Sequence, residues 1–151
     1  MKQSLYRQQG VAAVEMALVL IPLVTLLFGI TEFGRALYQY NTLAKATRDG
    51  ARYLSAQGPG DAAEIGKAQC LVVYGNDACN GSPLVPGLTT AQVTVCDATS
   101  CPSTNASQAT GSGVINLVTV TVTGFAFSSA VPFVVPNITF NNISTTMRQI
   151  L

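Results

Sequence analysis

The hydrophobic pattern of the chain begins with one long apolar run. Almost all of the twenty residues from 11 to 30 are apolar, and Glu15 is the only charged residue among them. An α-helix rises about 1.5 Å per residue, so this run would extend about 30 Å, the thickness of the hydrocarbon core of a bilayer. The pattern therefore predicts a transmembrane helix near the N-terminus, over residues 11–31.

The helical pattern continues beyond the apolar run. Apolar and small residues recur at spacings of three and four, as on one face of an α-helix, and charged residues occupy the other face. The first face contains Ala36, Tyr40, Leu43, Thr47, Ala51 and Leu54, and the second contains Arg35, Lys45, Arg48, Asp49 and Arg52. The turn sequence Gly58-Pro59-Gly60 follows, so we expect one long helix over residues 11–57.

Proline and glycine residues would modify this helix. Pro22 has no backbone N–H and crowds the preceding turn, which predicts a helix break or kink near this residue. Gly29, Gly34 and Gly50 either permit close packing between helices or act as flexible joints, and the sequence leaves both interpretations open.

The remaining residues, 58–151, have the pattern of a small domain. Residues 61–74 predict a second, short helix, with Asp61 as its N-cap and Glu64 as the capping-box partner. Three runs then alternate with period two and indicate strands of an antiparallel sheet. These runs are residues 91–96, 114–127 and 138–143, with a loop predicted over 103–113. The predicted fold class is α+β, a long membrane-spanning helix followed by a short helix and a small antiparallel sheet.

Residues 130–136 (AVPFVVP) form an apolar segment that does not fit the sheet. Prolines bound it, and proline is excluded from the interior strands of a sheet. The segment is either a loop folded onto the core or a surface that touches the membrane or a neighbouring subunit, because exposed apolar patches mark contacts.

Composition limits the classes of partner and compartment. The chain has 151 residues, a net charge of +1 and only 10% charged residues, so no basic surface indicates nucleic-acid binding. Four cysteines in a membrane-anchored chain indicate an oxidising compartment. Pairing of sequence neighbours, Cys70 with Cys79 and Cys96 with Cys101, closes the smallest loops, although four cysteines allow three connectivities.

The sequence contains no recognisable active site. Histidine is absent, so a nucleophilic triad lacks its usual base, and no motif surrounds a Ser-Lys pair. The cysteine spacings fit zinc poorly, and no glycine-rich phosphate loop follows a strand. We therefore expect a protein that is not an enzyme and that has no metal or cofactor.

Glu15 needs an explanation, because an acid within a membrane span is costly and indicates a functional site. Alone, it could mark the membrane interface and reach water. However, a short basic leader (MKQSLYRQQG) ends in Gly10, and Glu15 is the fifth residue of the apolar run that follows (VAAVE). This arrangement resembles type IV prepilins, and with the strings EFGRALY and ATRDGARY the first 55 residues or so resemble the TadE-like proteins of Tad (Flp) pilus systems.

The resemblance implies a function and a set of partners. A prepilin peptidase would remove the leader, residues 1–10, by cutting between Gly10 and Val11, and it stays open whether Val11 is then methylated. Glu15 would pair with the N-terminal amine of an adjacent pilin subunit, and the chain would work with the Tad assembly machinery as a minor pilin or pseudopilin, since the main Flp pilins are much shorter. The fold would be type IV pilin-like.

Location follows from the same features. Lys2 and Arg7 favour a cytoplasmic N-terminus, and the cysteines favour an extracytoplasmic domain over residues 58–151, so we expect a single-pass protein of the bacterial inner membrane that could enter a surface pilus. Four alternatives stay open. Gly10 could simply start the helix, or the apolar run could be a secretory signal despite its length. The chain could also be an uncleaved membrane-anchored binding or adhesion protein, or an anchored enzyme, which the missing catalytic residues disfavour.

Overall fold

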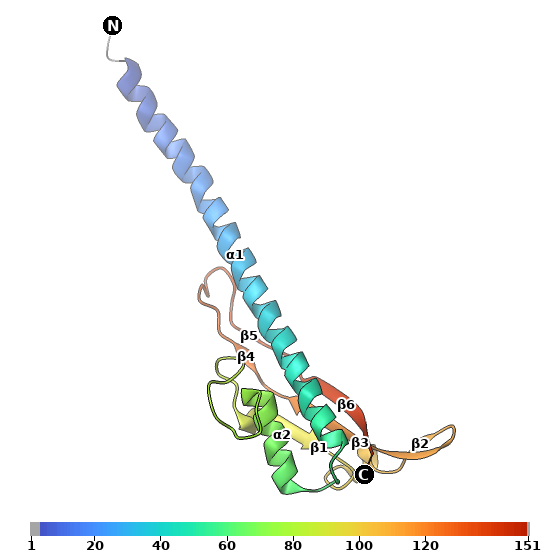
Figure 1. Cartoon of the computed structure of the whole chain (residues 1–151). Coiled ribbons are helices and arrows are strands. Elements are labelled where there is room, and N and C mark those ends of the chain that lie inside the picture. The colour runs from blue at the N-terminus through green and yellow to red at the C-terminus, as the bar shows by residue number, and fades with distance from the viewer. Residues whose placement is uncertain (1–3, 151) are drawn as a thin grey trace.

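The computed structural model describes residues 4–150, so Leu151 and the first three residues of the predicted leader lie outside the described residues. Its dominant element is helix α1 (Ser4–Ser55), which has 52 residues. Figure 1 shows α1 as a rod whose C-terminal half packs on a small globular part while its N-terminal half projects away from it. The layout is the predicted α+β one, with the sheet and the second helix gathered at one end of α1.

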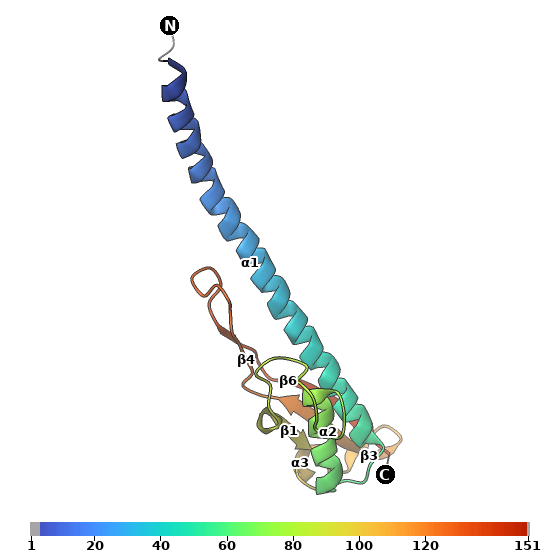
Figure 2. The same cartoon turned by 60° about the vertical axis from the view of Figure 1, so that its left-hand side comes forward.

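Helix α1 passes through Pro22 without interruption. The helix is therefore not interrupted at this residue, and a kink there stays a prediction; Figure 2 shows a gentle curvature along the rod. A proline removes one backbone hydrogen bond, and the helix-forming residues on both sides carry the helix across that gap. The helix also begins at Ser4, so Gly10 lies within it and does not start it.

The second helix, α2 (Ala62–Tyr74), is capped at both ends. The Asp61 carboxylate accepts hydrogen bonds from the backbone N–H groups of Ala63 (2.9 Å) and Glu64 (3.3 Å), which confirms the predicted N-cap. The predicted capping-box role of Glu64 is wrong, because its carboxylate instead accepts bonds from the Tyr53 hydroxyl of α1 and from Lys67. These contacts join the start of α2 to the end of α1.

The main sheet is antiparallel and is built around one central strand. Strand β3 (Gly113–Val122) lies between β1 (Val93–Cys96) and β6 (Ile143–Gln149), so that Val122 faces Val93 on one side and Ile143 on the other. Strand β2 (Gln108–Thr110) pairs with the first residues of β3. A separate two-stranded ladder joins β4 (Ala126–Phe127) to β5 (Ile138–Thr139).

The predicted strands are correct in kind, but several boundaries differ. The strand expected over 114–127 is divided into β3 and β4, because Gly124 has a left-handed backbone (φ 65°) that turns the chain. The run 138–143 likewise contributes to both β5 and β6. A single 3₁₀ turn, η1 (Thr90–Gln92), precedes β1, and the predicted loop 103–113 contains most of the short helix α3 (Pro102–Asn105) and all of β2.

The core lies between α1, α2 and one face of the sheet. Alternate residues of β3, Val118, Val120 and Val122, are buried against the helices, as the period-two pattern predicts. Leu43 and Leu54 of α1 are buried with them, and each such side chain contributes about 1.5–3 kcal/mol on burial. On the helical face predicted from the sequence, Tyr40 is the exception, since it is exposed.

Gly50 shows why a small residue is needed where the two helices meet. A Cβ atom at this position would lie 2.7 Å from a methyl carbon of Val72 in α2 and 3.5 Å from the Ala68 carbonyl oxygen. Of the two interpretations left open by the sequence, close helix packing is therefore the correct one for Gly50. Gly34, in contrast, has no neighbour within 4 Å of such an atom.

Both disulfides join sequence neighbours, as expected. The Cys70–Cys79 bond ties the last turns of α2 to the loop that follows, and the Cys96–Cys101 bond ties the end of β1 to the start of α3. Each bond therefore closes a short connection at the edge of the globular part, and neither reaches the projecting half of α1.

Candidate functional site

The projecting half of α1 exposes apolar side chains on all sides. Among the described residues, one helical stretch, Gly10–Ser55, is long and apolar enough to cross a membrane, and its most apolar window is wholly unburied. A helix that is apolar all round needs an apolar environment, which here must be lipid or other helices. Its exposed large residues include Val11, Val14, Leu18, Ile21, Leu26 and Phe28.

The residues predicted for cleavage and assembly lie at the far end of this surface. Gly10 is exposed within α1, and a Cβ atom built there would have no neighbour within 4 Å. Val11 and Glu15 are also exposed and stand one helical turn apart, about 6 Å along the axis. All three are therefore accessible to a partner from outside the chain.

A second acid, Glu32, lies directly after the apolar run and is only 5% exposed. One carboxylate oxygen, Oε2, accepts bonds from the Ser129 hydroxyl (3.0 Å), the Ala130 backbone N–H (3.0 Å) and Arg35 Nη2 (2.9 Å). Burial by itself raises the pKa of Glu32, but the bonds from Ala130 and Ser129 and the charge of Arg35 outweigh it and lower the pKa. The carboxylate is therefore ionised at neutral pH, and it holds a segment almost one hundred residues away.

Arg35 completes this arrangement. Its Nη2 atom also donates to the Ser128 carbonyl oxygen at 2.6 Å, and its guanidinium lies 4.9 Å from the centre of the Phe127 ring. We call Glu32, Arg35 and their partners Ser128, Ser129 and Ala130 the Glu32–Arg35 clamp. It fastens the β4–β5 loop, residues 128–137, to α1, and Figures 1 and 2 both show this loop rising beside the helix.

The clamp was not predicted from the sequence, although the string EFGRALY contains both of its charged residues. The available signal was an acid placed just past an apolar run with an arginine three residues later, a spacing at which helical side chains can pair. The partners in the β4–β5 loop are uncharged, and no local pattern links them to α1.

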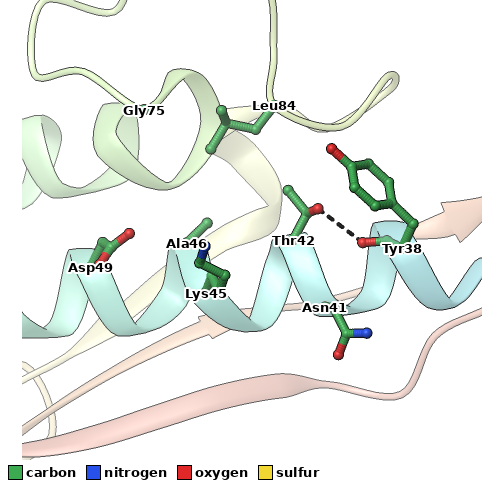
Figure 3. A pocket seen from close by; sticks show the side chains of 8 residues that line it. All are labelled: Tyr38, Asn41, Thr42, Lys45, Ala46, Asp49, Gly75 and Leu84. Carbon is green, nitrogen blue, oxygen red and sulfur yellow. Dashed lines mark hydrogen bonds between the residues drawn. The ribbon is translucent and has the colours of Figure 1, made fainter.

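A groove on the C-terminal half of α1, the half that carries the globular domain, faces the loop that follows α2. It has a volume of about 450 Å³, and its lining includes Tyr38, Lys45, Asp49 and Leu84. Figure 3 shows Leu84 pointing from the loop toward α1, and the Thr42 hydroxyl bonded to the Tyr38 carbonyl oxygen of the same helix. No ion pair joins Lys45 to Asp49 in the described part of the chain. The groove is open and of mixed polarity, and it is separate from the clamp.

One protein family matches the part of α1 that contains the apolar run and the charged residues of the clamp. The model of the TadE-like protein family matches residues 10–52. Residues 10–52 are TadE-like. The match begins at Gly10 and includes Glu15, Glu32 and Arg35, and it ends before α2 and the sheet. It associates the chain with the Tad pilus machinery in general.

The globular part stands outside that match. No curated protein and no solved structure matches the chain. The TadE-like match therefore bears on α1 alone, and no relative indicates a role for the domain at the C-terminal end of that helix.

Proposed function

We propose that this TadE-like chain is a minor pilin or pseudopilin of a Tad (Flp)-type pilus or secretion apparatus, with a structural and not a catalytic role. One observation carries the proposal. The family match begins at Gly10 and extends over the exposed apolar half of α1 and the outer half that bears the globular domain. A helix with an exposed apolar half and a domain fixed to its other end is suited to assembly through the helix.

The first proposed step is removal of residues 1–10 by a prepilin peptidase on the cytoplasmic face of the bacterial inner membrane. Gly10 is within α1, so its peptide must leave the helix before an enzyme can cut it. Glycine in a helix interior costs about 1 kcal/mol relative to alanine, which favours local opening at this point. Its exposure and the absence of a Cβ atom also allow close approach by the peptidase.

The second step is pairing of Glu15 with the new N-terminal amine of an adjacent subunit. Glu15 is exposed on an apolar helix, where an unpaired carboxylate would be unfavourable once water is excluded. An amine a few Å away stabilises the charge strongly in such surroundings. The charge pair would therefore align neighbouring helices in register.

The third step is packing of the exposed apolar residues into a bundle with other pilin subunits. Leaving the bilayer would otherwise place the apolar half of α1 in water, so helices of neighbouring subunits must replace the lipid. The disulfide-bonded domain stays outside the membrane, in the oxidising compartment, and the Tad assembly machinery acts on the helix.

The experiment is mass analysis of the intact N-terminus of the mature protein from its native membrane. We expect a chain that starts at Val11. Substitution Gly10→Val should leave the leader attached, whereas Gly34→Val should not, although a Cβ atom meets open space at both positions. A wild-type chain that starts at Met1 and is absent from filaments would instead support an uncleaved, membrane-anchored binding or adhesion protein.

A further inference from the structure

We propose that the β4–β5 loop inserts its apolar tip, residues 130–136, into the outer leaflet of the bilayer that α1 crosses. The chain would then hold the membrane at two places, through the span and through the tip beside it. The inference depends on α1 spanning a membrane, but not on leader cleavage, on Glu15 pairing or on assembly into a filament.

The position of the tip along α1 carries the inference. Phe133 lines an apolar groove of about 260 Å³ with residues of the apolar run, namely Leu20, Ile21, Val24, Thr25 and Phe28. A Cβ atom at Gly29 would lie 3.7 Å from a methyl carbon of Val134. The tip therefore lies beside residues 20–29 of α1, on the membrane side of residue 30, where the apolar run ends. At this depth α1 itself would be surrounded by lipid.

The chemistry of the tip suits that depth. Phe133 is 82% exposed, and Pro132 and Pro136 are also exposed. No charged residue occurs between Asp97 and Arg148, so insertion of the tip would move no ionised side chain from water into lipid. The groove between the tip and α1 is lined by apolar side chains with one threonine, and an acyl chain would fill it more favourably than water.

The backbone polar groups of a loop that enters a leaflet need partners, either within the protein or at the wet headgroup level, since the hydrocarbon supplies none. The N–H groups at the base of the tip bond to side-chain oxygens, and those at its far end bond to the Val131 carbonyl oxygen. The donors are Ser129 (to Asn137), Ala130 (to Glu32), Val131 (to Ser129), and Val134 and Val135 (both to Val131). Pro132 and Pro136 have no N–H. Among residues 129–136, this leaves Phe133 as the one N–H donor without a partner in the described part of the chain. Of the carbonyl oxygens of these residues, that of Val131 alone accepts a bond there, so the others must stay at the headgroup level of the leaflet, within reach of water.

The Glu32–Arg35 clamp keeps the tip at this depth. Its bonds hold Ser128, Ser129 and Ala130 against α1 immediately below the tip, at the level where the apolar run ends. The two charges of the clamp neutralise each other, and Arg35 is partly exposed, as expected for a cation at the membrane surface. We choose lipid as the occupant, and not a second copy of the chain, because the tip is continuous with the apolar surface of the span.

The chain has no tryptophan, so Phe133→Trp provides a single fluorescent probe at the tip. The full-length variant is reconstituted into phosphatidylcholine–phosphatidylglycerol vesicles, and its quenching by brominated lipids and by aqueous iodide is measured. Phe28→Trp serves as a control within the span. Tyr38→Trp serves as a control outside it, since Tyr38 is 70% exposed and lies about 12 Å beyond residue 30 along the helix.

We expect Phe133→Trp to behave like Phe28→Trp, with strong quenching by brominated lipid and iodide quenching several-fold weaker than for Tyr38→Trp. Iodide quenching equal to that of Tyr38→Trp would overturn the proposal. So would protection from iodide without quenching by brominated lipid, especially if it disappears as the protein is diluted in the vesicles, because that result indicates contact with a second copy. Leader cleavage is scored separately on the same protein by mass, so failure of the pilin proposal would leave this result readable.

Discussion

Residues 11–30 and the stretch from Ala36 to Leu54 belong to one helix, yet their surroundings are opposite. The first part exposes nearly every apolar side chain, whereas the second buries Leu43, Ala46, Ala51 and Leu54 under the sheet and α2. Both stretches have the same helical geometry, so their different burial comes from the arrangement of apolar side chains. These surround the helix in the first stretch and occupy one face in the second. One packed domain can bury a single apolar face of a helix, but a helix that is apolar on all faces requires lipid or several neighbouring helices.

The two acids Glu15 and Glu32 differ in the same way as the apolar residues around them. Glu15 is exposed on the projecting half. Glu32, which lies where the projecting half meets the half that carries the domain, is buried and bonded to residues of the β4–β5 loop. We therefore expect changes in the projecting half to affect assembly, and changes in the outer half to affect the stability of the domain.

The largest effect is expected from Glu15→Ala. Removing one partner of a buried charge pair costs about 3–5 kcal/mol, so incorporation into filaments should fall at least a hundredfold while leader cleavage is spared. The measurement is the ratio of mature protein in sheared filaments to that in membranes. Thr25→Ala is a matched control, because that hydroxyl bonds only a carbonyl oxygen of its own helix. Normal incorporation of Glu15→Ala would contradict the charge pairing.

Leu43→Ala should have the next largest effect, and it should act on the domain. Leu43 is completely buried, so its truncation should lower the free energy of unfolding by about 2–5 kcal/mol. Leu26→Ala removes the same atoms from an exposed position of the projecting half and should leave domain stability unchanged. Denaturant unfolding of the detergent-solubilised chain, followed by near-ultraviolet circular dichroism, measures both. Equal losses for the two variants would contradict the division between the two halves of α1.

Glu32→Ala should release the β4–β5 loop without unfolding the sheet. Hydrogen bonds to charged groups contribute about 1.5–3 kcal/mol, so the Ala130 amide should exchange its hydrogen roughly ten to a hundred times faster. Amide exchange followed by mass spectrometry or NMR would show this. Glu64→Ala removes the carboxylate of the Glu64–Lys67 ion pair and should leave the Ala130 amide unaffected. Unchanged exchange in Glu32→Ala would show that the clamp does not hold the loop.

Asp97 offers a smaller effect that depends on pH. Burial raises the pKa of Asp97, but hydrogen bonds from the backbone N–H groups of Ser100, Gly60 and Thr99 and from the Ser100 hydroxyl outweigh it and lower the pKa. Because the folded pKa lies below the unfolded value, near 3.9, the stabilisation is present above that pH and is lost as pH falls through the folded pKa.

The matching measurement compares wild type with Asp97→Asn. At pH 7 the variant should be less stable by about 1.5 kcal/mol, the lower end for a hydrogen bond to a charged group. The difference should shrink as the pH falls from 5 to 2, since the wild-type carboxylate is then protonated. Denaturant unfolding over this pH range tests it, and a difference that stays constant with pH would exclude the carboxylate as the cause.

Local patterns in the sequence were sufficient for much of this protein. The apolar run, the Asp61 cap and the strand alternation each depend on residues within a few positions of one another, and the two disulfides join cysteines separated by 9 and 5 residues. Gly10 and Glu15 were predicted as cleavage and assembly residues from a motif of similar length, and these roles stay predictions. All of these features concern helix periodicity, capping or short loops, for which neighbouring residues determine the conformation.

Only the tertiary structure decided the rest. Glu64 bonded to Tyr53 instead of completing a capping box, because the end of α1 packs beside the start of α2 and offers its carboxylate another partner. The clamp is the clearest case. Glu32 and Ala130 are 98 positions apart, and nothing in either neighbourhood indicates the other. They meet because the sheet packs on the C-terminal half of α1 and directs the β4–β5 loop back along the helix toward its projecting half. This is an outcome of three-dimensional packing that no local period encodes.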